Sequence, residues 1–267
     1  QGNQGQQPAY APDARAAKLG NQPVALSYKA SDKKEMVDFN GYAYTRTPSA
    51  VSGALMTRYD ETKPQVWRVP LWQDIVPDFQ VTAPRAGYIV PAAYAALVGE
   101  KLRQHGVEFR KLDKTVERFE GETFRADKAT LAAGAVEGHQ RLTVEGKWKA
   151  EARPVAAGSL FVPIAQPKAR LVVAMLEPQA PDSLLAWGTF NTAFERKEYM
   201  EDYVAEEVAR EQMAADPSVA KAFQERLDSD PAFARNPQAR LEFFAKRHSS
   251  YDERLNLYPV LRANVAP

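Results

Sequence analysis

Cysteine is absent from this 267-residue chain. Disulfides, cysteine nucleophiles, iron–sulfur clusters and cysteine zinc sites are therefore excluded. A metal ion would have to be bound by His, Asp and Glu, and the chain has three histidines.

The chain also lacks an excess of charge and a long apolar run. Lys and Arg number 35 against 34 Asp and Glu, and no basic stripe is interleaved with aromatic residues, so nucleic acid is not a predicted partner. No apolar run approaches the roughly 18 residues that cross a bilayer, which predicts no membrane span. The start, QGNQGQQPAYAP, has neither the basic residues nor the apolar core of a signal peptide, so the compartment cannot be read from it.

What is present is typical of an ordinary globular protein, with 45% hydrophobic and 26% charged residues. The length suits one large or two modest domains. Residues 1–22 begin with a polar, Gln- and Gly-rich stretch without an initiator Met. They are interpreted as a flexible start, or as the join to an upstream domain.

Hydrophobic periodicity predicts an α+β fold in three parts. Residues 23–80 form a β-rich segment followed by a proline-rich connector, where only short or edge strands fit because proline cannot donate a ladder hydrogen bond. Residues 81–181 form a mixed region, with a β-α-β element over 86–112 and a second β stretch that includes ARLVVAMLEP. Residues 182–267 form a helical C-terminal subdomain.

The helical part carries two kinds of signal. Apolar residues at helical spacing predict a long amphipathic helix through about residue 213, and they are Phe190, Phe194, Tyr203, Val204 and Val208. Three capping residues stand directly before proline, which predicts three further helix starts at Asp216-Pro217, Asp230-Pro231 and Asn236-Pro237.

One stretch resembles a zinc half-site. RQHGVEFRKL contains His105 and Glu108 as H-x-x-E, and His248 follows 140 positions after Glu108. Zinc needs such ligands to converge at about 2.0–2.2 Å. However, Gly106 follows a helical pattern and is the preferred residue for ending a helix, which favours a helix end at His105 and a strand at Glu108. His248 is interpreted in the same way, as a last-turn residue.

Aromatic residues give a second set of candidates. Trp67, Trp72, Tyr42 and Tyr44 could form a platform that binds sugar or peptide, although aromatics at strand spacing are more often core. The carboxylates of ERKEYMEDYVAEEVARE are interpreted as a solvated helix face. Motifs for a nucleophilic serine, a phosphate-binding loop or a dinucleotide site are missing from the sequence.

Three phrases resemble a known family: GYAYTRTPSAVSGALMTRYDETKPQVWRVPL, TAPRAGYIVPAAYAALVGEKLRQHG and SLFVPIAQPKARLVVAMLEPQAPDSLLAWGTFNTAFERKEYMEDYV. They are similar to the C-terminal half of bacterial proteins that carry an N-terminal zinc carboxypeptidase domain. The resemblance covers most of residues 36–262, and the block 158–204 is the most specific. It implies that the zinc ligands and the catalytic glutamate belong to an upstream domain, and no catalytic residue is transferred to this chain.

Three functions follow as hypotheses. The first is an accessory region of a zinc carboxypeptidase-like protein, inactive alone, with zinc and peptide hydrolysis in the upstream domain, and with a periplasmic or extracellular location implied by the resemblance. The second is an independent module that binds peptide or cell-wall glycan. The third is a self-contained zinc hydrolase that uses His105, Glu108 and His248.

Overall fold

The computed structural model describes residues 18–197 and 199–267, which form two compact units. One unit runs from Asn21 to Ala83, and the other is built mainly from Pro84–Pro267. Helices and antiparallel sheets are both present, so the predicted α+β fold is confirmed. The flexible start predicted for residues 1–22 falls mostly outside the described residues.

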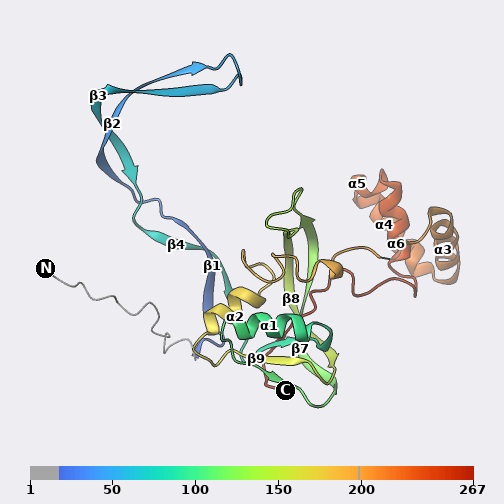
Figure 1. Ribbon diagram of the computed structural model, residues 1–267. Coiled ribbons are helices and arrows are strands. Elements are labelled where there is room, and N and C mark those ends of the chain that lie inside the picture. The colour runs from blue at the N-terminus through green and yellow to red at the C-terminus, as the bar shows by residue number, and fades with distance from the viewer. Residues whose placement is uncertain (1–17, 198) are drawn as a thin grey trace. The chain divides into compact units, whose positions relative to one another are not determined.

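The unit Asn21–Ala83 consists of paired strands. Strand β1 (Pro23–Ala30) pairs antiparallel with β4 (Ile75–Thr82), and β2 (Glu35–Pro48) pairs antiparallel with β3 (Leu55–Leu71). The β2–β3 ribbon is long and twisted (Figure 1). For the proline-rich stretch, which is predicted to hold only short or edge strands, the edge alternative fits: β3 is long, with 17 residues, and contains Pro64 and Pro70. In a two-stranded ribbon both strands are edges, where proline is tolerated.

The second unit is centred on a six-stranded antiparallel sheet with the order β6-β9-β5-β10-β7-β8. Its strands are β5 (Gly87–Val90), β6 (Arg110–Lys111), β7 (Val116–Leu131), β8 (Leu142–Val155), β9 (Leu160–Pro163) and β10 (Leu261–Ala263). Strand β10 lies in the interior of the sheet, where it pairs with β5 on one side and with β7 on the other. The end of the chain therefore joins the two halves of the sheet.

The β-α-β element is present between β5 and β6. The connection is a short 3-10 helix, η2 (Ala92–Tyr94), followed by α1 (Ala95–Gln104). Since β5 and β6 are both antiparallel to β9, they run parallel to each other with β9 between them. The element is thus a split β-α-β unit, a detail that local periodicity cannot reveal.

Helix α1 ends at the position predicted from Gly106. Gly106 adopts φ 62°, its N–H donates to Arg103 O at 2.8 Å, and the N–H of Val107 donates to Leu102 O at 2.9 Å. This pair of bonds is the Schellman motif, which favours glycine at the left-handed position. Leu102 and Val107 are both buried, as the motif's hydrophobic contact requires.

The segment ARLVVAMLEP is not a strand. Ala169–Leu176 forms helix α2, and its buried residues recur at helical spacing: Ala169, Val172, Val173, Met175 and Leu176. A short, almost wholly apolar run fits a buried strand and a buried helix equally well, so periodicity alone misled the prediction.

The C-terminal helices are α3 (Asp202–Ala215), α4 (Pro217–Ser229), α5 (Pro231–Ala234) and α6 (Pro237–Ala245). The last three begin at the predicted caps. Asp216 accepts from Ser218 N–H at 2.8 Å, Asp230 from Phe233 N–H at 3.0 Å and Asn236 from Ala239 N–H at 3.0 Å. Phe223, Phe233, Phe243 and Phe244 pack together between the helices, with ring centroids 4.7 Å apart for Phe223 and Phe244.

The long helix predicted from Phe190 is wrong in its first half. Turns and the 3-10 helix η3 (Asn191–Ala193) precede α3, which starts only at Asp202. Phe190 is completely buried against Tyr94 and Tyr258, with ring centroids at 4.9 and 5.2 Å. Because Phe190 packs against these two rings, it is not part of the apolar face of α3.

Candidate functional site

The three residues of the predicted zinc half-site have separate structural roles. His105 is the C-terminal cap of α1, and its Nδ1 donates to Lys101 O at 2.8 Å. Glu108 is exposed, and its backbone is held by Gln166, which accepts from Glu108 N–H at 2.8 Å and donates to Glu108 O at 3.0 Å. His248 Nδ1 lies 2.7 Å from Ser250 Oγ.

Within residues 18–197 and 199–267, no group of three or more His, Asp or Glu side chains is placed to hold a metal. The structure therefore does not bring His105, Glu108 and His248 together. In the same part of the chain, no helix is long and apolar enough to cross a bilayer.

The β2–β3 ribbon does bring aromatic rings together. Phe39 and Trp67 face each other in the register, as do Tyr44 and Tyr59. Ring centroids are 6.2 Å apart for Phe39 and Trp67, 5.8 Å for Tyr44 and Trp67, and 6.0 Å for Tyr44 and Tyr59. These four residues form the ribbon cluster. Three of its rings are about half exposed, at 55% for Phe39, 47% for Tyr44 and 59% for Tyr59.

The ribbon cluster differs from the predicted platform. Trp67 and Tyr44 belong to it, whereas Tyr42 and Trp72 are exposed and make no ring contact with any described residue of the cluster. A register shift between Tyr42 and Ala43 changes which side chains share a face. The sequence could not place that shift, so Phe39 and Tyr59 were missed.

A cleft of about 640 Å³ lies in the second unit. Its walls come from the end of β5 and the start of η2, from the end of β8, and from the segments around residues 192–197 and 252–261. Most of the lining is apolar, including Ile89, Tyr94, Val155, Leu257, Pro259 and Leu261. The volume and lining are those of a small-molecule site, which is about 300–1,000 Å³ in proteins.

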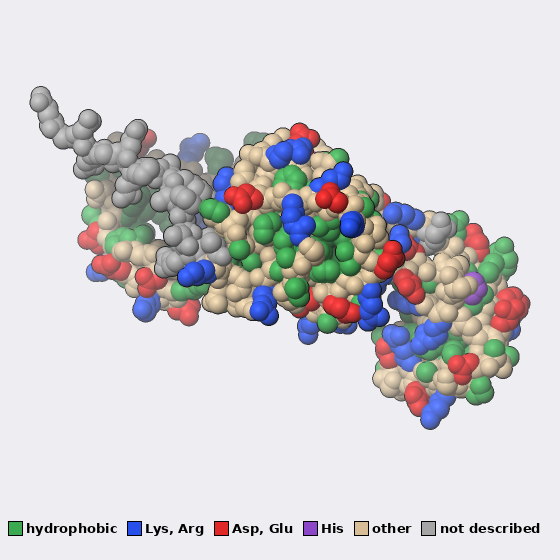
Figure 2. All heavy atoms as spheres, turned by 90° about the horizontal axis from the view of Figure 1, so that it is seen from below, with side chains coloured by type: hydrophobic (Ala, Val, Ile, Leu, Met, Phe, Trp, Pro, Cys, Tyr) green, Lys and Arg blue, Asp and Glu red, His purple; other side chains and the backbone are tan. Residues whose placement is uncertain are grey.

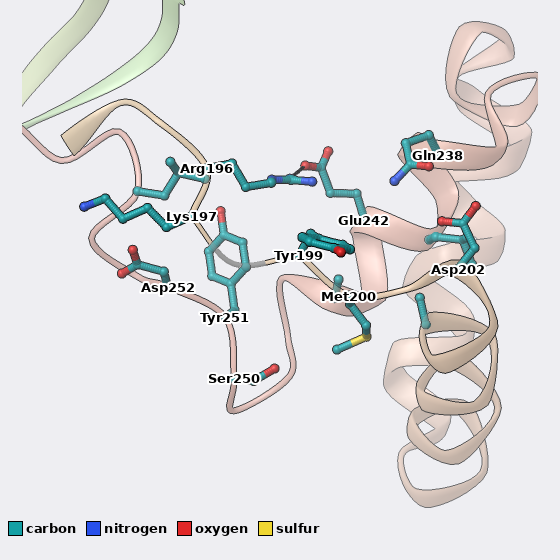
Figure 3. Close-up of a pocket in the computed structure, with 14 residues that line it drawn as sticks. Arg196, Lys197, Tyr199, Met200, Asp202, Gln238, Glu242, Ser250, Tyr251 and Asp252 are labelled. Atoms are coloured by element: carbon teal, nitrogen blue, oxygen red, sulfur yellow. Dashed lines mark hydrogen bonds and ion pairs between the residues drawn. The ribbon is translucent and has the colours of Figure 1, made fainter. Parts of the chain in front are cut away.

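Charged side chains in the cleft are mostly cationic. Arg153, Lys197 and Arg254 line it together with a single carboxylate, Asp252. Lys197 and Asp252 also line a smaller pocket of about 150 Å³ beside α6, in which Arg196 forms an ion pair with Glu242 (Figure 3). On the face drawn in Figure 2, by contrast, blue and red side chains are interspersed.

No protein-family model, curated protein or solved structure matches this chain significantly.

A network of buried polar side chains contacts one wall of the cleft. Glu177, 1% exposed, follows α2 directly and accepts from Tyr88 Oη at 2.6 Å, from Arg262 Nη2 at 2.7 Å and from Trp148 Nε1 at 3.1 Å. The guanidinium of Arg262 also lies 4.5 Å from the centre of the Trp148 ring. Burial raises the pKa of Tyr88 well above its ordinary value, and the Glu177 charge adds to this rise, so Tyr88 stays a donor.

The network is joined to the cleft through Tyr258. This side chain lines the cleft, is fully buried, and donates from its hydroxyl to Leu176 O at 3.0 Å, next to Glu177. Its ring also packs against Trp148, with centroids 6.2 Å apart. The network therefore fixes one wall of the cleft.

Sequence reasoning missed both the cleft and the network. Arg153, Glu177, Arg254 and Arg262 are far apart in the sequence, by up to 109 positions. A usable signal was the position of Glu177, directly after an almost wholly apolar run, because a carboxylate there needs a buried partner. The identity of that partner depends on the tertiary fold.

Proposed function

We propose that this chain is the non-catalytic C-terminal region of a zinc carboxypeptidase-like protein, and that it packs on an upstream catalytic domain or shapes access to it. One observation carries the proposal. The block that resembles the family most specifically, residues 158–204, supplies β9, α2, Glu177 and one wall of the cleft. A resemblance concentrated in core-building positions favours a shared fold.

The residues of the predicted half-site do not meet. Within residues 18–197 and 199–267, no group of three or more His, Asp or Glu side chains is placed to hold a metal. Zinc and the hydrolytic residues are accordingly placed by this proposal in the upstream domain, together with binding of the peptide substrate. The resemblance implies a periplasmic or extracellular location for the whole protein.

The isolated chain is expected to release no amino acid from the C-terminus of peptides, with or without added zinc. The protein expressed from its complete reading frame is expected to do so, and to lose this activity when zinc is removed by a chelator. Amino-acid release by both proteins, measured on the same peptides, checks this. The reading frame itself should encode an H-x-x-E and a distant His before residue 1.

Two results would contradict the accessory function. One is a natural N-terminus at Gln1 with no carboxypeptidase-like domain in the same protein or complex. The other is stoichiometric zinc in the isolated chain that is lost in His105→Ala and kept in His139→Ala, a matched variant of an exposed histidine outside the predicted half-site.

The ribbon cluster favours a second function, binding of a peptide or a cell-wall glycan. Its four rings are grouped on a two-stranded ribbon, and Gly41 lies beneath the Trp67 ring, where a Cβ would come within 2.6 Å of the indole. Grouped, partly exposed aromatic rings bury large apolar area when a ligand stacks on them.

Trp67→Ala is expected to weaken binding of a soluble cell-wall glycan fragment or an extended peptide by about tenfold or more, as loss of a central aromatic anchor does. Trp72→Ala is the matched control, because Trp72 is exposed and lies outside the ribbon cluster. Intrinsic tryptophan fluorescence during ligand titration measures the effect. Equal affinities for both variants and the parent chain would eliminate the ribbon cluster as the binding surface.

A further inference from the structure

The cleft combines apolar walls with an excess of positive charge. Three cations, Arg153, Lys197 and Arg254, line it against the single carboxylate of Asp252. Such a lining favours a ligand that has an apolar body and a negative charge. The feature is independent of any zinc chemistry upstream.

Arg153 is the best-positioned of these cations. It lies near the end of β8, where it pairs with Phe119 of β7, and its side chain is 26% exposed. Its Nη2 is 2.7 Å from Glu151 Oε1, whereas its Nε is buried and has no hydrogen-bond partner among the described residues. A buried N–H without a partner costs free energy. A ligand in the cleft would meet the part of the Arg153 side chain that is accessible, since Nε itself is closed to solvent.

Glu151 orients the guanidinium and stays ionised. A hydrogen bond from the Thr123 hydroxyl, at 2.6 Å, lowers the pKa of Glu151, and the Arg153 charge lowers it further against the opposing effect of burial. The carboxylate is therefore available to hold Nη2 across the neutral pH range. An arginine held in this way presents its remaining N–H groups in a fixed geometry, which suits an oxygen anion.

We propose that the cleft is a binding site for an amphipathic carboxylate, with the carboxylate on Arg153 and the apolar body against Tyr94, Leu257 and Pro259. A singly charged anion fits better than a phosphate dianion, because Asp252 in the lining and Glu151, which pairs with Arg153, offset two of the three positive charges. The same chemistry is offered by the C-terminus of an apolar peptide and by a free fatty acid.

The experiment is calorimetric titration of the whole chain with three probes: N-acetyl-phenylalanine, its uncharged amide, and decanoate. The acid is expected to bind at least about tenfold more tightly than its amide, because a charge-assisted hydrogen bond is lost. Binding of N-acetyl-phenylalanine alone assigns the site to peptide ends, binding of decanoate alone assigns it to fatty acids, and binding of both supports the shared carboxylate chemistry.

Variants locate the site. Arg153→Gln is expected to weaken the carboxylate by about tenfold or more, and Arg153→Lys to restore part of the loss. Arg118→Gln is the matched control, since Arg118 pairs with Glu120 on the exposed surface of β7 and does not line the cleft. Ala156→Trp tests the cleft without touching Arg153, because Ala156 is an exposed lining residue whose enlargement should block the ligand.

Three results would overturn the proposal: equal affinity for acid and amide, unchanged affinity in both Arg153→Gln and Ala156→Trp, or no binding of any carboxylate to the folded chain. None of them bears on the accessory function, which is tested by the hydrolytic activity of the complete protein. Thermal unfolding of each variant confirms that the chain is folded.

Discussion

Removal of residues 261–267 is expected to prevent folding of the unit Pro84–Pro267. Strand β10 lies between β5 and β7, so its loss leaves ladder groups on both neighbours without partners. The same deletion removes Arg262 and leaves the buried carboxylate of Glu177 without its cation. Near-ultraviolet circular dichroism and thermal unfolding measure the effect, and we expect loss of the cooperative transition.

A shorter deletion is the control. Removal of residues 265–267 keeps β10 and keeps Asn264, whose Oδ1 accepts from Arg85 N–H at 3.3 Å. Val265 is 69% exposed, so little burial is lost. If the chain without 261–267 unfolded cooperatively within about 4 °C of the parent, or about 1 kcal/mol for this size, the role given to β10 would be wrong.

Glu177→Ala is expected to cost about 3–5 kcal/mol of the free energy of unfolding. The substitution leaves the guanidinium of Arg262 and the hydroxyl of Tyr88 in the interior without their shared acceptor. Breaking a buried ion pair from one side is costly because the remaining charge has already lost its hydration. Urea unfolding measures the change.

Two comparisons separate this network from generic surface effects. Glu145→Ala breaks the pair of Lys128 and Glu145, whose side chains are 66% and 71% exposed, and should cost less than about 1 kcal/mol. Combining Glu177→Ala with Arg262→Ala should cost less than the sum of the single changes, since the second change removes the unpaired charge. Additive costs would mean that the two side chains do not act as a pair.

The network and β10 together explain how the cleft is built. Strand β10 brings Arg262 beside Tyr88 of β5, and the residues just before it, Leu257 and Tyr258, form one wall of the cleft. The segment that completes the sheet, β10 with the residues just before it, therefore also completes the proposed carboxylate site. A ligand bound there should raise the stability of the folded chain, and the gain should grow with the logarithm of the ligand concentration once that concentration exceeds the dissociation constant.

Local signals in the sequence determined the features that depend on neighbouring residues. Asp216, Asp230 and Asn236 cap helices at the predicted positions, because a capping side chain bonds to N–H groups two or three residues away. Gly106 ends α1 for an equally local reason, the left-handed conformation that glycine adopts freely. The same reasoning correctly placed His105 at a helix end.

Tertiary structure alone decided the features that join distant segments. Residues 169–176 are apolar enough for either a strand or a helix, and packing made them a helix. The shift at Tyr42 chose Phe39 and Tyr59 for the ribbon cluster, and the insertion of β10 between β5 and β7 brought Arg262 to Glu177. Spacing along the chain does not encode these pairings. A buried charge is stabilised by whichever opposite charge lies beside it in space, and Arg262 lies beside Glu177 only once β10 has paired with β5 and β7.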